Sequence, residues 1–272
     1  MPDRVSLCAT RRTFDDCLPL ARIYGTGLEF QAFAYPEVLD NGCAELVSHY
    51  RRALRAFTGL RTMHGPFIDM ASGTPDRLIR AAVEQRVRQS FTIAAELDVT
   101  LVVFHVNFIA SLRNADYRQT WLLHQVEFWE PLAEVATQYG ITVALENMWE
   151  FEPQIMRELL LRLNNPIFCT CLDVGHAHLF SENKFDEWLN VLGPYIQYTH
   201  LNNNYGKLDD HNALTEGVID YVPVLAGLRR LAPAPVFALE MHHTYALRKS
   251  LECFDLGASF PAKSAAPTSA SV

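Results

Sequence analysis

One stretch of the chain, residues 198–217, collects side chains that bind divalent metal ions. It starts as an expected strand, turns through three asparagines and a glycine, and brings His200, Asp209 and His211 into one neighbourhood. Imidazole and carboxylate groups are ligands that Zn²⁺ and Mn²⁺ accept, and an Asp-x-His pair places two of them close together. Surface loops are also rich in Asp, Asn and His. Taken alone, the stretch therefore fits a solvated loop better than a metal site.

The elements that must position these residues follow a regular alternation. Short apolar runs alternate with longer segments of helical periodicity about eight times, as a closed barrel of βα units requires. The sequence therefore predicts the α/β class and a single (β/α)8 TIM barrel. The expected strands are Val5–Ala9, Gly27–Phe33, Leu60–His64, Thr100–Val106, Ile141–Glu146, Ile167–Asp173, Tyr195–Leu201 and Val236–Met241. The expected helices are Phe14–Ile23, Ala44–Phe57, Pro75–Leu97, Tyr117–Tyr139, Pro153–Leu163, Phe185–Leu192, Ile219–Leu231 and Tyr245–Phe254.

The last six expected strands each carry a possible metal ligand at or near the end. In a parallel barrel the carboxyl ends of all strands meet at one rim, where catalytic groups gather. One charged residue ending an apolar strand is unremarkable, whereas six in succession indicate a site. Further candidates lie on expected loops: His176, Asp209 and His211. The six at the strand ends are His64, His105, Glu146, Asp173, His200 and Glu240.

Bulk properties set the class of protein. The chain has 272 residues, 49% of them apolar, and a formal net charge of −8. That charge gives no basic footprint for nucleic acid. The chain has six cysteines, no leading apolar segment and no apolar run long enough to span a bilayer, so we expect a cytoplasmic enzyme. Residues 1–256 are expected to form one catalytic domain, and residues 257–272, rich in Ala, Ser and Pro, a disordered tail.

Local signals mark some element ends and buried positions. Thr74-Pro75-Asp76 predicts a helix start with Thr74 as the cap, and Gly140 predicts the end of a helix. Cys169 and Cys171 lie two apart in an apolar strand, so we expect both on one face as small core residues.

As an ordered set, these residues resemble the xylose-isomerase-like TIM barrel superfamily (AP endonuclease family 2), and within it the endonuclease IV branch most closely. The resemblance covers roughly residues 5 to 255. It rests on the segments His64-Gly-Pro-Phe67, Val103-Phe-His105, Ala144-Leu-Glu-Asn147, Leu172-Asp-Val-Gly-His176, Thr199-His200, Asp209-Asp-His211, Thr215-Glu-Gly217 and Leu239-Glu240.

The resemblance implies up to three divalent ions, with Zn²⁺ favoured and Mn²⁺ or Fe²⁺ as alternatives. One ion would be held by His64, His105 and a bridging Glu146. A second would share Glu146 and add Asp173, His200 and Glu240, and a third would be bound by His176, Asp209 and His211. The simple isomerases of the superfamily generally have neither the two early histidines nor the Asp-x-His pair. On that ground the sequence favours phosphodiester hydrolysis of a small sugar- or nucleotide-containing substrate.

DNA is a disfavoured substrate, because the glycine-rich motif that the DNA-repair branch carries after its strand-five glutamate is absent. Here Glu146 is followed by Asn-Met-Trp-Glu-Phe.

Under the hypothesis of hydrolysis, Glu146 holds the metal pair, while Asp173 or Glu240 orients the nucleophile. The alternative is isomerisation or epimerisation of a sugar or sugar phosphate with one metal and Glu146 and Glu240 as the acid and base. A barrel that binds a metal or ligand without turnover is the third hypothesis. Weaker substrate-binding candidates are Asn147, Lys207 and Trp149.

Overall fold

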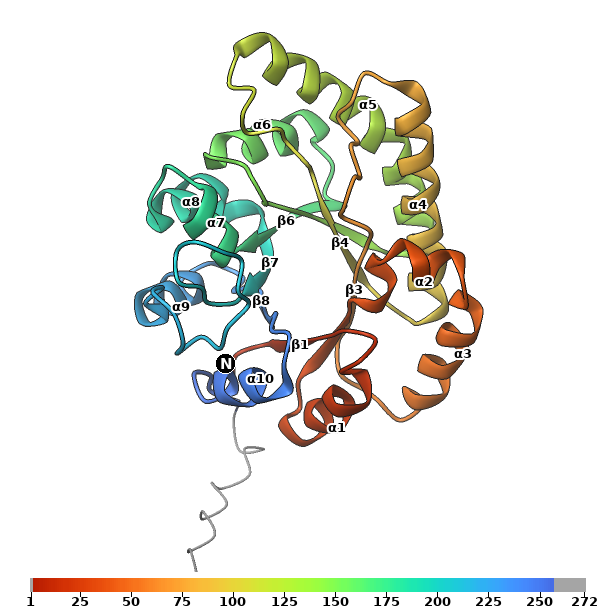
Figure 1. Cartoon of the computed structure of the whole chain (residues 1–272), viewed down its shortest axis with the longest axis vertical. Coiled ribbons are helices and arrows are strands. Elements are labelled where there is room, and N and C mark those ends of the chain that lie inside the picture. Colours follow the sequence, from red (N-terminus) through yellow and green to blue (C-terminus); the bar gives the residue numbers. More distant parts are fainter. Residues whose placement is uncertain (1, 257–272) are drawn as a thin grey trace, which may run out of the picture.

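Runs of four to six mostly apolar residues form the strands, because a parallel strand covered on both faces must be apolar on both. In the computed structural model, which describes residues 2–256, eight such strands close into a parallel barrel with the helices outside (Figure 1). Each strand pairs with the next in sequence, and β8 pairs with β1. The strands are β1 (Val5–Ala9), β2 (Gly27–Phe30), β3 (Arg61–His64), β4 (Leu101–His105), β5 (Thr142–Glu146), β6 (Phe168–Asp173), β7 (Ile196–Leu201) and β8 (Val236–Leu239).

The helices follow the strands along the chain and cover the barrel from outside (Figure 1). They are α1 (Phe14–Tyr24), α2 (Pro36–Asp40), α3 (Cys43–Ala53), α4 (Arg77–Glu96), α5 (Ala115–Tyr139), α6 (Pro153–Leu163), α7 (Val174–Phe180), α8 (Phe185–Leu192), α9 (Tyr221–Arg229) and α10 (Thr244–Leu251). Short 3₁₀ turns, η1 (Ala32–Ala34) and η2 (Gly193–Tyr195), complete the set. The predicted TIM barrel is thus confirmed, and the predicted tail, residues 257–272, lies outside the described residues.

Several predicted boundaries were wrong. Strand β2 ends at Phe30 because the chain turns into η1, and β8 ends at Leu239, so Glu240 lies just beyond its strand. Helix α4 begins at Arg77, where Asp76, not Thr74, is the cap: its Oδ1 accepts hydrogen bonds from the backbone N–H groups of Leu78 and Ile79. Gly140, in contrast, ends α5 in the left-handed conformation, as predicted.

Short helix α7 replaces the loop expected around His176. It begins directly after β6 because the Asp173 carboxylate accepts a hydrogen bond from the backbone N–H of His176 at 2.6 Å. One carboxylate therefore ends a strand, caps a helix and faces the site.

Mostly small side chains, together with Tyr198, fill the interior of the barrel below the rim. This inner cluster is separate from the larger core between strands and helices, and Cys169 and Cys171 belong to it, as predicted. Its members are Cys8, Val103, Ala144, Cys169, Cys171, Tyr198, Val236 and Ala238. Among residues 2–256, no helix has the length and apolar character needed to cross a membrane.

Candidate metal centre

The barrel brings all nine predicted ligands together at the carboxyl ends of its strands. Register explains part of this convergence, because His105 is paired with Glu146 and Asp173 with His200 on neighbouring strands. The nine side chains fall into three overlapping groups, described in turn below.

Glu146 lies at the middle of the first group. Its Oε2 is 3.1 Å from Nε2 of both His64 and His105, and its Oε1 is 2.9 Å from Nδ1 of His200. The carboxylate is fully buried. Burial alone would raise the pKa of Glu146, but His200 and His105 lower it well below the usual range. Glu146 is therefore held as an anion surrounded by three imidazoles.

The second group shares Glu146 and His200 and adds Asp173 and Glu240. Ligand atoms of these four residues lie within 4.8 Å of one another. Burial raises the pKa of Asp173 to about 7, even though His176 lowers it. Two glutamates, an aspartate and a histidine make a donor set suited to a divalent ion.

Asp209 organises the third group. Its Oδ2 is 3.1 Å from Nε2 of His176 and 3.0 Å from Nε2 of His211. Burial lowers the pKa of both imidazoles, but the carboxylates around them prevail, raising the pKa of His176 to about 10 and that of His211 to about 9. This is the trio expected for the third metal site.

Backbone carbonyl groups set the orientation of three imidazoles. The Nδ1–H groups of His64, His176 and His211 donate to the carbonyl oxygens of Gly65 at 2.7 Å, Asn147 at 2.9 Å and Glu240 at 2.9 Å, respectively. Each ring thereby turns Nε2 toward a carboxylate of the centre, and in the neutral imidazole that nitrogen carries the lone pair. Such fixed tautomers are typical of histidines that bind metal ions.

Two buried carboxylate oxygens fit a metal ion because they have no hydrogen-bond partner among the described residues. They are Oε2 of Glu240 and Oδ1 of Asp209. A buried charged oxygen without such a partner is costly, and cations bound beside these oxygens would offset their charge. The donor set and these two oxygens therefore fit a divalent metal.

A cavity of about 230 Å³ opens onto the centre. Part of its wall is apolar, with Tyr35, Phe67 and Met148 among the lining residues. Its polar lining includes His64, His105, His176, Asp209, His211 and Glu240. The cavity has the size and chemistry of a site for a small polar molecule.

The weaker substrate-binding candidates lie elsewhere. Asn147 is buried, with its side-chain amide bonded to the backbone N–H and C=O of Asp173. Lys207 is exposed, Trp149 is 42% exposed, and Met148 rather than Trp149 lines the cavity. Asn147 thus supports Asp173 instead of facing the cavity.

Strand β2 and the turn after it contribute two residues that the sequence analysis missed. Glu29 is fully buried, and its Oε2 lies 2.9 Å from Nε2 of His200. The amide of Gln31 donates to Oε1 of Glu240 at 2.6 Å. A single acidic residue within a short apolar run was the available signal for Glu29.

Comparison with known proteins agrees with this architecture. Residues 26–256 match the family model described as xylose isomerase-like TIM barrel. The chain belongs to that family. Its relatives include the protein MJ1311 of Methanocaldococcus jannaschii, 28% identical over 185 residues, which are 65% of this chain and 63% of MJ1311. The match thus spans less than two thirds of that relative's length.

Two solved structures of the same fold cover nearly all of this chain. The TTHB071 protein from Thermus thermophilus, in a structure soaked with ZnCl₂, is 25% identical with a TM-score of 0.76, covering 93% of this chain and 96% of its own. A D-tagatose 3-epimerase-like protein is 21% identical with a TM-score of 0.75, covering 92% of this chain and 95% of its own.

Proposed function

We propose that this chain is a divalent-metal-dependent isomerase or epimerase of a small sugar or sugar phosphate. The observation that carries the proposal is the group of Glu146, Asp173, His200 and Glu240 beside a small cavity, with one Glu240 oxygen that has no hydrogen-bond partner among the described residues. The structural likeness to a D-tagatose 3-epimerase-like protein supports it. The sequence analysis favoured hydrolysis, but the comparisons support this alternative better.

Glu146, Asp173 and His200 would hold the ion beside Glu240, and when bound it would polarise a carbonyl group and the neighbouring hydroxyl of the substrate. Glu240 lines the cavity and would act as the base. Its Oε2 would take a proton from the carbon next to the carbonyl and return it to the carbonyl carbon, while the hydroxyl proton moves to the former carbonyl oxygen, so the reaction needs no co-reactant. Gln31, bonded to Oε1, leaves Oε2 as the oxygen that faces the substrate.

Glu146 is a weaker candidate for proton transfer than the sequence suggested. It is not among the residues lining the cavity, and its two oxygens face three histidines. Isomerisation by a single carboxylate therefore fits the geometry better than epimerisation, which requires a proton to be delivered to the opposite face of the carbon.

The test is proton exchange with solvent. The metal-loaded protein is incubated with panels of aldoses and ketoses in D₂O, and deuterium next to the carbonyl is followed by NMR. We expect exchange and isomer formation in the wild type and in Lys207→Ala, which alters an exposed side chain outside the cavity. We expect neither in Glu240→Gln, whose metal content is measured in parallel.

Phosphoester hydrolysis is the second candidate, because one specific feature favours it. Twice in this centre, a single carboxylate oxygen lies within 3.1 Å of two imidazole nitrogens: Glu146 Oε2 with His64 and His105, and Asp209 Oδ2 with His176 and His211. A one-metal isomerase does not need these additional donors. They fit a centre of two or three ions that activates water and stabilises charge on phosphoryl oxygens.

Metal content per chain separates the two functions. We infer Zn²⁺ as the ion, on the strength of the histidine-rich donors and the zinc-soaked relative. One equivalent, unchanged in His64→Ala/His105→Ala, supports the isomerase. Two or three equivalents, falling in that variant, together with cleavage of phosphodiesters and no sugar exchange, would instead support a hydrolase.

A further inference from the structure

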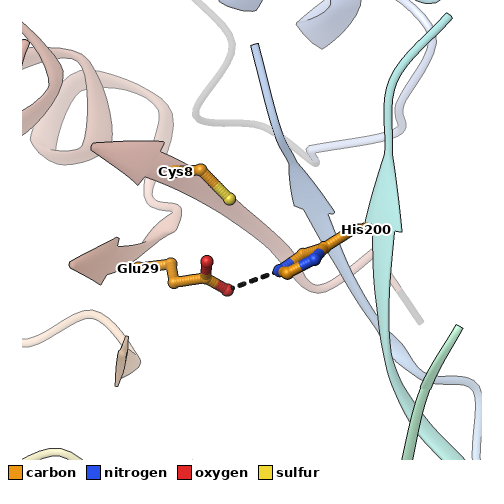
Figure 2. A group of neighbouring side chains, drawn as sticks. All are labelled: Cys8, Glu29 and His200. Carbon is orange, nitrogen blue, oxygen red and sulfur yellow. Dashed lines mark hydrogen bonds and ion pairs between the residues drawn. The ribbon is translucent and has the colours of Figure 1, made fainter. Parts of the chain in front are cut away.

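His200 is oriented differently from the three imidazoles of the centre that are fixed by hydrogen bonds to backbone carbonyl groups. His64, His176 and His211 present Nε2 to the carboxylates, whereas His200 presents Nδ1, 2.9 Å from Glu146 Oε1 and 3.5 Å from Glu240 Oε2. Its Nε2 points the opposite way, toward Glu29 (Figure 2). The ring of His200 is thus held by a carboxylate, whereas each of the other three imidazoles is held by a backbone carbonyl group.

Glu29 has few other ways to satisfy its charge. It is fully buried on β2, its Oε2 is 2.9 Å from His200 Nε2, and its Oε1 is 3.4 Å from the amide nitrogen of Gln31. An anion buried without strong hydrogen bonds is costly, so the His200 Nε2–H group is its principal partner.

We propose that Glu29 is a positioning residue that holds the proton of His200 on Nε2 and so makes Nδ1 its metal-binding nitrogen. A neutral imidazole has one N–H donor and one lone pair, so fixing the proton on one nitrogen assigns the metal to the other. Glu29 itself stays outside the coordination sphere. The inference rests on the metal centre of the proposed function and holds for either reaction.

A rival arrangement uses the same residues. Cys8 Sγ, a Glu29 oxygen and a His200 nitrogen lie within 4.8 Å of one another, so they could themselves hold an ion below the centre. In Figure 2 the Cys8 side chain lies beside the Glu29 carboxylate, facing the same space. An ion there would take the Nε2 lone pair of His200, and a neutral ring could then not also bind through Nδ1. The two arrangements are therefore exclusive.

The test compares Glu29→Gln and Glu29→Ala with Glu150→Gln as the matched control. Glu150 is also a buried carboxylate, but it accepts hydrogen bonds from the backbone N–H groups of Phe108 and Met148 instead of His200. Zinc affinity is measured by competition with a chromophoric chelator. We expect Glu29→Ala to weaken binding about 100-fold and Glu29→Gln about tenfold, the range seen when a ligand's hydrogen-bond partner is removed. Glu150→Gln should match the wild type.

A spectroscopic measurement separates positioning from a general loss of structure. In ¹⁵N NMR of the zinc-loaded protein, we expect His200 to bind through Nδ1 in the wild type and in Glu29→Gln, whose amide oxygen still accepts the Nε2–H bond. In Glu29→Ala, binding through Nε2 should appear. If Glu29→Ala does not fold, the isosteric Glu29→Gln decides: affinity within twofold of the wild type would overturn the proposal.

Cobalt distinguishes the rival site. Thiolate bound to Co²⁺ gives a near-ultraviolet charge-transfer band. We expect the Co²⁺-loaded wild type to show no such band, and therefore the same near-ultraviolet spectrum as Cys8→Ala. Such a band would overturn the positioning role and assign Cys8, Glu29 and His200 as ligands. A wild-type protein that binds no divalent metal would refute the proposed centre itself, whereas normal binding that is indifferent to Glu29 would refute only this inference.

Discussion

Asn203 offers a sharp test of how the loop after β7 is held. Its Nδ2 donates to the carbonyl oxygens of Leu214 at 2.8 Å and Ile219 at 3.0 Å. Its Oδ1 accepts from the backbone N–H groups of Asn204 at 2.9 Å and Ile219 at 3.0 Å. One buried side chain therefore ties together both ends of the loop that carries Asp209 and His211.

The expected cost of Asn203→Ala follows from these four hydrogen bonds. Each contributes about 1 kcal/mol net, and a buried group that loses its partner costs at least that much. The backbone bonds between residues 203 and 212 survive the substitution. We therefore expect a loss of about 3–4 kcal/mol in the free energy of unfolding, measured by urea denaturation of the metal-free protein.

The same variant should lose metal selectively. The third group depends on the loop, whereas Glu146 and its partners lie on strands, so we expect an ion loaded at the third group to be lost and an ion beside Glu146 to be retained. Asn165→Ala is the control, because it removes a single exposed hydrogen bond to the backbone of Ile167 and should cost less than about 1 kcal/mol. A loss below about 1 kcal/mol in Asn203→Ala would refute this reasoning.

Three further outcomes are expected. Gly217→Ala should destabilise the same loop, because a Cβ there would lie 2.2 Å from Oδ1 of Asn203; wild-type stability would contradict the packing. Metal binding at the third group should release up to two protons at about pH 7, since the pKa values of His176 and His211 are raised to about 10 and 9 and a bound imidazole must be neutral; calorimetry in buffers of different ionisation enthalpy measures this. Burial raises the pKa of Glu150 to about 6, so its contribution to stability is complete below about pH 4 and is lost as pH rises through 6. Glu150→Gln should remove about 2 kcal/mol of that pH dependence, and an unchanged unfolding profile would show that the raised pKa is absent.

Much of the fold was predictable because the barrel repeats one unit. Alternating apolar runs located all eight strands to within a few residues, and the candidate ligands were visible because they end those runs. Helix α7 was missed because it depends on Asp173 as its cap, and it is only seven residues long. Short helices carry little periodic signal.

The supporting contacts were not predictable from the sequence. Glu29 and His200 are separated by 171 positions, and only closure of the barrel brings β2 opposite β7. The run of asparagines after β7 fitted turn formers or substrate contacts equally well. The structure buries Asn202, Asn203 and Asn204, and it bonds the Asn202 amide to Asp173 at 3.0 Å. Such pairings depend on three-dimensional closure, which local pattern does not encode.

The triple use of Asp173 limits how this protein can be redesigned. Its Oδ1 caps α7 and its Oδ2 accepts a hydrogen bond from the Asn202 amide, so both oxygens already make hydrogen bonds that hold the local structure. Removing the carboxylate to abolish metal binding would also loosen the helix that carries His176. The loss of activity in such a variant could then not be assigned to the lost metal ligand alone. An engineer who wants an intact scaffold with altered reactivity should leave Asp173 in place and vary Glu240, which follows its strand and caps no helix.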